Sequence, residues 1–340
     1  MTERSRQGDE MRIRTTIVVC ALALACCSSA LAAGPPPKPK AAGGQTVTVV
    51  ARGVPTPTAF AFLGGETFVA GFGDEEHPKI TGGVYVLKSG KPVKIAGSPP
   101  HVFGLATSGT TLYVSSGNQI LAWSGWNGTR FANSKVVATG PKRFSGFNGI
   151  VVVPGGKLYS GVSLSNGKKA DYAHGTTPFA NDIVSVDIAS GGIGVVAKGL
   201  RQPWQFTYVP GHSGPLVSDL EQENLGKGLP PDYVFEVKKG ANYGFPTCPA
   251  QPAKCSKFDK PFAQFPAHAS PMGLGSLGGK LYVALFGGTG KGPEVVSLPA
   301  AGGKLTPVLT GFVTPVVALG VHAGAVYVGD LTGAVYSVKP

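Results

Sequence analysis

The segment at residues 272–284 reads MGLGSLGGKLYVA, and residues 317–329 repeat its pattern as VALGVHAGAVYVG. Each segment contains an apolar strand, a glycine-rich turn and a second strand that ends near a Tyr-Val pair. Residue character alternates with a period of two and β-branched residues are frequent, which is typical of strands and not of helices. The chain therefore contains a repeated β-hairpin, and an internal repeat is the first guide to an architecture.

The same hairpin pattern occurs along the whole chain. The residue at the Tyr position recurs at Phe68, Tyr113, Tyr159, Leu216, Tyr282 and Tyr327. A third strand follows each hairpin, and a fourth strand completes every unit except the last. These units predict an all-β protein, a six-bladed β-propeller over residues 45–340. The segment TVTVVARGVP (46–55) has the pattern of the missing strand. We therefore expect it to pair with residues 335–339 and close the ring without an open edge.

Composition and charge agree with a folded domain. The 340 residues include 51 glycines and 29 prolines, and 42% of them are hydrophobic and 14% charged, which excludes a disordered chain and a coiled coil. The net charge is +12, but the lysines are scattered singly and form no dense basic run with interleaved aromatic residues. We therefore expect no nucleic-acid partner.

The first 32 residues have the pattern of a signal peptide, with a basic stretch, a short apolar run and a small-x-small cleavage site ending at Ala32. Translation begins at Met1 or at Met11. The apolar run is too short for a stable membrane span, and the region matches the lipoprotein lipidation motif poorly. We therefore expect secretion or export to the periplasm or cell envelope after cleavage near Ala32. Residues 33–44 are expected to form a Pro/Lys/Gly linker.

The cysteines agree with export. Beyond the expected signal peptide the chain contains only Cys248 and Cys255. Two lone cysteines this close in an oxidising compartment predict a disulfide, which we expect to clip one hairpin.

Propeller geometry brings together loops that are far apart in the sequence. The connections between blades and the loops between second and third strands meet on one face, around the mouth of the central channel. Polar loops on a rigid scaffold commonly bind ligands, so we expect the functional site on this face. These loops carry His101, Arg143, Phe144, Arg201, Gln202 and His268, together with Asp74 to His77, Asp171, Tyr172, His174 and Asp219 to Asn224.

The fourth unit carries a family resemblance. It contains GLRQPWQFTYVPG (199–211) and SDLEQENLGKGLPPDYVFEVKKGANYGFPTC (218–248), and FPAHASPMGL (265–274) follows. This combination resembles the glucose/sorbosone dehydrogenases, soluble six-bladed propellers that use pyrroloquinoline quinone. The resemblance implies an oxidoreductase that acts on a small sugar or aldehyde, with the quinone and Ca²⁺ as cofactors.

The resemblance also implies roles for single residues. Arg201 stands where the family's arginine binds the carboxylates of the quinone, Gln202 stands where the family usually has Asn, and His268 matches a histidine at the channel mouth. The acids Asp219, Glu221 and Glu223 lie in the region that holds Ca²⁺ over the cofactor.

One position departs from the family pattern. Ser145 stands where the family has its general-base histidine, and an unassisted serine hydroxyl cannot take a sugar proton near neutral pH. His101 and His174 are the candidate substitute bases. Three hypotheses stay open: a quinone-dependent sugar or aldehyde dehydrogenase, a non-catalytic propeller that binds carbohydrate or envelope ligands, and another enzyme such as a metal-dependent lactonase.

Overall fold

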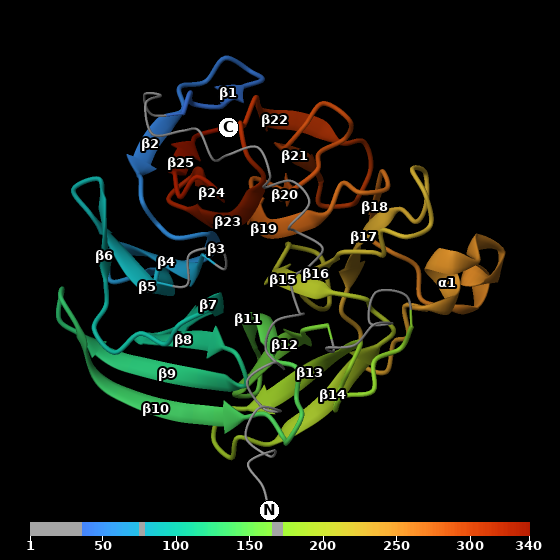
Figure 1. Ribbon diagram of the computed structural model, residues 1–340, viewed down its shortest axis with the longest axis horizontal. Coiled ribbons are helices and arrows are strands. Elements are labelled where there is room, and N and C mark those ends of the chain that lie inside the picture. Colours follow the sequence, from blue (N-terminus) through green and yellow to red (C-terminus); the bar gives the residue numbers. More distant parts are fainter. Residues whose placement is uncertain (1–35, 75–78, 165–172) are drawn as a thin grey trace, which may run out of the picture.

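The computed structural model describes residues 36–74, 79–164 and 173–340, and it is a six-bladed β-propeller. Figure 1 shows six small antiparallel sheets arranged radially around a central axis. The predicted fold class is therefore confirmed. The expected signal peptide (1–32) lies outside the described residues, as do Glu75, Glu76 and His77 of one mouth loop and Asp171 and Tyr172 of another.

The first three blades are each formed by four consecutive strands. Blade 1 contains β3 (Pro57–Leu63), β4 (Glu66–Gly73), β5 (Thr81–Lys88) and β6 (Lys91–Lys94). Blade 2 contains β7 (Val102–Ser108), β8 (Thr111–Ser116), β9 (Gln119–Trp126) and β10 (Phe131–Thr139). Blade 3 contains β11 (Phe147–Val153), β12 (Lys157–Val162), β13 (Asp182–Asp187) and β14 (Ile193–Lys198).

Blade 4 contains β15 (Pro203–Thr207), β16 (Leu216–Asp219), β17 (Asp232–Glu236) and β18 (Ala263–Phe265). The last two blades, 5 and 6, each include a strand from the start of the described chain. Blade 5 contains β19 (Pro271–Leu277), β20 (Lys280–Leu285), β21 (Glu294–Pro299), β22 (Thr306–Thr310) and β1 (Lys40–Ala41). Blade 6 contains β23 (Val316–His322), β24 (Ala325–Asp330), β25 (Val335–Val338) and β2 (Thr48–Ala51).

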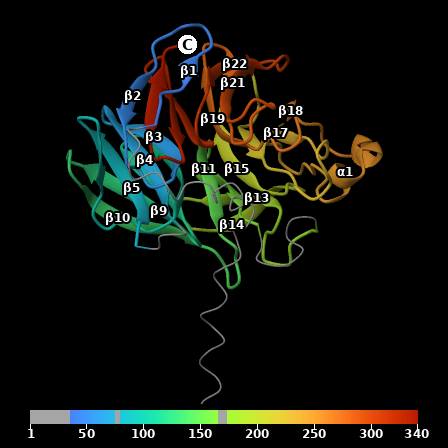
Figure 2. The same ribbon diagram turned by 45° about the horizontal axis from the view of Figure 1, so that its top comes forward.

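The ring is closed by pairing between the two ends of the propeller. Strand β2 pairs antiparallel with β25, with Thr48 opposite Ser337 and Ala51 opposite Val335. Figures 1 and 2 show the blue β2 beside the red β25. The predicted closure is therefore confirmed. Within the segment expected to be a linker, Lys40 and Ala41 form β1 and pair with Thr310 and Leu309, which adds a fifth strand to blade 5.

Apolar side chains fill the spaces between neighbouring blades. Each of the six hydrophobic clusters joins residues of two adjacent blades, so every blade packs on both of its faces. Phe68 of blade 1 and Leu112 of blade 2, for example, are fully buried in one such cluster. This packing makes the hydrophobic effect the main force that holds the blades in a ring.

Buried side chains of the first or second strands of blades 1 to 4 also donate hydrogen bonds to backbone carbonyls of the inner strand of the next blade. This belt consists of Thr58 Oγ1 to Val102 O (2.8 Å), Ser115 Oγ to Asn148 O (2.6 Å), Asn148 Nδ2 to Pro203 O (2.7 Å) and Ser218 Oγ to Met272 O (2.8 Å). A buried polar group that loses its partner costs about 1–3 kcal/mol. The belt therefore sets the register between blades as well as contributing to stability.

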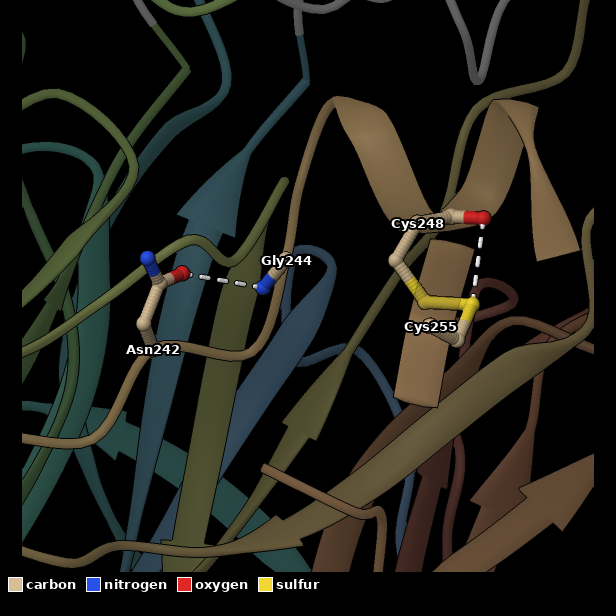
Figure 3. The surroundings of a disulfide bond; sticks show 4 residues. All are labelled: Asn242, Gly244, Cys248 and Cys255. Atoms are coloured by element: carbon tan, nitrogen blue, oxygen red, sulfur yellow. Dashed lines mark hydrogen bonds between the residues drawn. A yellow bond between two sulfur atoms is a disulfide. The ribbon is translucent and has the colours of Figure 1, made fainter. Parts of the chain in front are cut away.

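A short helical segment projects from blade 4 outside the ring (Figure 1). It contains α1 (Thr247–Ala250) and the 3₁₀ helix η2 (Pro252–Lys257), and a disulfide joins Cys248 to Cys255 (Figure 3). The predicted disulfide is present, but it closes a helical turn and not a hairpin, because prolines interrupt this stretch and prevent strand pairing. Among the described residues, no helix is long and apolar enough to cross a bilayer.

Removing β2 should destabilise the propeller much more than removing β1. A chain that begins at Gly53 loses the β2–β25 pairing and uncovers Tyr336, which is fully buried. We expect its thermal midpoint to fall by roughly 5–10 °C relative to a chain that begins at Ala33. A chain that begins at Gly44 loses only the two-residue β1 and is the matched control. Equal midpoints for all three chains in calorimetry would show that the ring does not depend on β2.

The disulfide should contribute modestly, because it closes a loop with a sequence separation of only 7. The double variant Cys248→Ser/Cys255→Ser should lose about 2–3 kcal/mol of unfolding free energy at most, measured by urea denaturation. Reduced wild-type protein should behave like the variant. Mass spectrometry that finds both thiols free in protein recovered outside the cytoplasm would contradict the expected bond.

Candidate functional site

Strand pairing places the mouth residues on one face. In blades 2 and 4 the first residue of the inner strand lies opposite the last residue of the second strand: Val102 pairs with Ser116, and Pro203 with Asp219. The other blades pair in the same sense. The loops that precede inner strands and those that follow second strands therefore surround the same end of the channel, as the sequence predicted.

Asp219 holds the loop that carries Arg201 and Gln202. It is fully buried at the end of β16, and its two carboxyl oxygens accept the backbone N–H groups of Arg201 (3.2 Å) and Gln202 (2.8 Å). The side chain of Gln202 in turn accepts the N–H of Leu164 at 3.0 Å. Asp219 and Gln202 therefore fix the backbone of the mouth and are already engaged in structural hydrogen bonds.

A second buried carboxylate, Asp232, organises the neighbouring loop. Its oxygens accept the N–H groups of Glu221 and Ser270, each at 2.8 Å, and so connect the loop after β16 to the loop before β19. Glu221 is 4% exposed, and its Oε2 is buried without a hydrogen-bond partner in the described part of the chain. The Nη1 of Arg201 donates to the carbonyl of Leu220 at 3.0 Å, and Arg201 is 2% exposed.

The buried acid cluster, which we define as Asp219, Glu221 and Asp232, has unusual protonation. Burial raises the pKa of Asp219 to about 7 and that of Asp232 to about 6, although backbone hydrogen bonds and Arg201 oppose the shift. Burial and the charge of Asp219 raise the pKa of Glu221 well above its ordinary value. Around Arg201, three carboxyl groups whose pKa values are all raised by burial therefore share one cation.

The segment at residues 241–245, part of the stretch that carries the family resemblance, has a structural role. Lys198 donates its N–H to the carbonyl of Ala241, and the N–H groups of Tyr243 and Phe245 donate to the carbonyls of Lys198 and Gly199. Figure 3 shows Asn242 Oδ1 accepting the N–H of Gly244 at 3.1 Å. Gly244 has φ +100°, and a Cβ there would lie 2.7 Å from the Cβ of Cys248. This segment therefore anchors the end of blade 3 just before Arg201.

His268 and Glu223 form an ion pair at the rim. The Nδ1 of His268 lies 2.7 Å from the Glu223 carboxylate, and its Nε2 lies 2.9 Å from the carbonyl of Gly226. Burial alone would lower the pKa of His268, but these two acceptors raise it above its ordinary value. Because both ring nitrogens face acceptors, the ring is held as a donor on both sides and is not available as a base.

The three predicted base positions lie in different surroundings. The hydroxyl of Ser145 donates to the carbonyl of Ser163 at 2.6 Å. The ring of His101 packs on Phe72 with centroids 4.7 Å apart, and its Nδ1 lies 3.0 Å from the Phe72 carbonyl. His174 contacts the carbonyl of Gly175 and interacts electrostatically with Asp182. None of these contacts creates a base paired with Arg201.

Aromatic side chains gather at the channel mouth, and only His101 among them stood out in the sequence. The mouth aromatic cluster, as we define it, comprises His101, Phe72, Phe103 and Trp204. Phe72 and Phe103 lie 5.1 Å apart, and Phe103 meets Trp204 edge-on at 6.0 Å, so residues of blades 1, 2 and 4 meet. These rings are half-buried or exposed, and the buried Trp204 Nε1 has no hydrogen-bond partner among the residues that the structure describes.

Comparison with known proteins establishes the fold. No protein-family model and no curated protein matches the sequence. The structure is similar to a Trichoderma reesei protein of carbohydrate-active enzyme family AA12, with TM-score 0.71 and 17% identity over 89% of this chain and 97% of that one. It is also similar to the pyrroloquinoline-quinone domain of a Coprinopsis cinerea pyranose dehydrogenase (TM-score 0.69, 17% identity, 91% and 98% covered).

A third similar structure is the quinone-bound aldose sugar dehydrogenase of Streptomyces coelicolor, with TM-score 0.65 and 19% identity over 90% of this chain and 99% of that one. The fold shared with these proteins agrees with the resemblance found in the sequence. At such identities the likeness establishes the six-bladed scaffold, and the chemistry must be judged from the residues present.

The described residues do not fit the quinone or its Ca²⁺. A tricarboxylate quinone needs open cationic donors, whereas Arg201 is 2% exposed and surrounded by the buried acid cluster. The oxygens of Asp219 and Asp232 already accept backbone hydrogen bonds. Among residues 36–74, 79–164 and 173–340, no group of three or more His, Cys, Asp or Glu side chains is arranged to hold a metal ion.

The predicted cofactor and metal residues gather in one part of the mouth, whereas the predicted base positions lie in different surroundings. Arg201, Gln202, Asp219 and Glu221 come together in one network, and Glu223 pairs with His268 at its edge. Asp232 completes this network but was not singled out, although the Pro-Pro-Asp sequence at 230–232 was the available signal. The mouth aromatic cluster had no sequence signal, because its members come from three blades.

The buried acid cluster should make stability depend on pH. The folded pKa values of about 7 for Asp219 and about 6 for Asp232 lie above the ordinary value of an unfolded aspartate. The native state therefore binds more protons in this range, and the contribution of these groups to unfolding free energy falls between about pH 4 and pH 7. In Glu221→Gln the loss of stability with rising pH should be smaller, because the variant lacks a carboxyl whose pKa burial raises well above its ordinary value.

Urea denaturation at a series of pH values measures this effect. Glu236→Gln is the control, and its effect on the pH dependence of stability should be opposite in sign. Burial would raise the pKa of Glu236, but hydrogen bonds from Ser213 and Gly214 lower it overall, so its stabilisation is lost as pH falls. A pH profile of Glu221→Gln identical to that of the wild type would contradict the assignment.

Proposed function

We propose that this chain is an exported propeller that binds carbohydrate at its channel mouth without oxidising it. The observation that carries the proposal is the environment of Ser145, the position at which the family resemblance requires a general base. Its hydroxyl donates to the Ser163 carbonyl and is not assisted by an imidazole in the contacts of the described residues. A hydroxyl in this state cannot remove a proton from a sugar near neutral pH.

The electrostatics of the mouth support a neutral ligand. The buried acid cluster outnumbers the single guanidinium of Arg201, and an anionic cofactor would approach carboxylates that burial already disfavours in their charged form. A neutral sugar meets no such penalty, because it brings no uncompensated charge into the site.

The mouth aromatic cluster supports carbohydrate as the ligand class. Sugar rings combine a flat C–H face with hydroxyl groups, and ligand sites commonly join aromatic walls to a few polar groups. Trp204, Phe103 and Phe72 provide half-buried aromatic surfaces at the mouth. Export is supported by the Cys248–Cys255 disulfide, which is typical of proteins outside the cytoplasm.

A quinone-dependent sugar dehydrogenase is the second candidate function. It is favoured by the position of Arg201 and Gln202 at the channel mouth and by the resemblance of blade 4. The similar structures include a quinone-bound aldose sugar dehydrogenase and a calcium structure of the Trichoderma reesei protein. Under this hypothesis Arg201 would contact the quinone, the loop from Asp219 to Glu223 would hold Ca²⁺, and His101 or His174 would be the base.

Titration with pyrroloquinoline quinone and Ca²⁺, followed by dye-reduction assays with aldoses, separates the two functions. We expect no saturable quinone binding and no dye reduction, in the wild type or in Ser145→His. Saturable quinone binding would overturn the non-catalytic proposal. Turnover only in Ser145→His would show a cofactor site that lacks its base.

Neutral oligosaccharide binding tests the mouth directly. Trp204→Ala should weaken the binding of maltotriose or a related neutral oligosaccharide by about tenfold, because it removes the indole face. Trp126→Ala removes a half-buried indole from an aromatic group in blade 2 and is the matched control. Calorimetric titration measures affinity, and thermal unfolding checks both folds. Equal affinities for the two variants would exclude Trp204 as the binding surface.

A further inference from the structure

The central channel contains a cavity on the side opposite the mouth. Its volume is about 390 Å³, and residues of all six inner strands line it. Most lining residues lie in the second halves of these strands, such as Phe62 of β3, Thr107 of β7 and Ser276 of β19. Because the first halves lead to the mouth, the cavity opens on the other face of the ring.

A side chain from blade 4 spans the channel between the cavity and the mouth. Gln205 is 8% exposed, and its Nε2 donates to the carbonyls of Phe103 (2.8 Å) and Thr58 (3.2 Å). It therefore reaches across the axis to blades 1 and 2, while Trp204 meets Phe103 just above it on the mouth side. The cavity has a polar floor and is separate from the proposed carbohydrate site.

The wall of the cavity is polar but carries no charged side chain. Each inner strand is the terminal strand of its sheet, so one backbone edge per blade faces the axis without a neighbouring strand. The lining side chains are aliphatic, aromatic, hydroxyl or amide groups, apart from His322 at the rim. His322 stacks on Phe62 with centroids 4.5 Å apart and an interplanar angle of 9°.

Glycines let neighbouring inner strands approach closely around the cavity. A Cβ at Gly320 would lie 2.7 Å from the Cβ of Phe60, and a Cβ at Gly275 would lie 2.6 Å from Leu319 Cδ2. Side chains at these positions would push the neighbouring inner strands apart. The width of the cavity is therefore built into the sequence of the inner strands.

From this arrangement we propose that the cavity is a second ligand site, which takes a neutral polyhydroxylated molecule of monosaccharide to disaccharide size. Its volume falls within the range of about 300–1,000 Å³ that is usual for small-molecule sites. An ion would have no partner charge among the lining groups, and burying an unpaired charge is costly. A purely apolar ligand would leave the free strand edges without hydrogen-bond partners, whereas hydroxyl groups satisfy them.

Nuclear magnetic resonance titration of the ¹⁵N-labelled wild type with glucose and maltose locates the site without any variant. Binding in the cavity should shift amides of residues 105–107, 205–207, 274–276 and 319–322. Gluconate and glucosamine, which carry charges, should produce much weaker shifts. Shifts confined to residues 72, 103 and 204 would support the mouth site and overturn the cavity site, and no shift with any sugar would also overturn it.

Thr107→Trp and Ser276→Trp fill the cavity from two different blades. Each should weaken the cavity shifts by about tenfold or more in apparent affinity. Thr306→Trp, at an exposed position of β22, is the matched control and should leave them unchanged. Trp204→Ala should also leave the cavity shifts unchanged, so failure of the mouth proposal and failure of the cavity proposal remain distinguishable. Equal affinity in both filled variants would overturn the cavity as the site.

Discussion

The pairing of β2 with β25 is the constraint on which the rest of the structure depends. It joins a strand near the start of the described chain to a strand at its end, so the ring of blades has no gap. In a closed ring, each interblade cluster has another such cluster on either side of it. Opening the ring would expose Tyr336 and the apolar residues around it, and it would release the inner strands that form both the channel mouth and the cavity.

Within the closed ring, buried polar groups place the functional loops. The belt from Thr58 to Met272 sets the register of successive blades, and Asp219 and Asp232 each tie two backbone N–H groups of the mouth. Asp219 serves the scaffold at a position where the resemblance suggested a metal ligand. The segment from Ala241 to Phe245 likewise has a structural role, because its backbone hydrogen bonds anchor the end of blade 3.

The candidate site was only partly predictable from residue types. Arg201, Gln202, Asp219 and Glu221 could be grouped because they flank two strands of one blade, and the period of the repeat placed those flanks on the same face. The states of these residues could not be predicted. Whether a carboxyl binds a metal or backbone N–H groups depends on angles and burial, and the raised pKa of Glu221 follows from the loss of water around it.

The sequence by itself determined the repeat, the number of blades, the closing strand and the disulfide partners, because period-two alternation, turn glycines and cysteine spacing are local properties. Only the tertiary structure decided that Trp204 meets Phe103, that Gln205 spans the channel and that the six inner strands leave a cavity. These features join residues of different blades. Their distances depend on how the blades tilt and pack around the axis, which no single segment of the chain encodes.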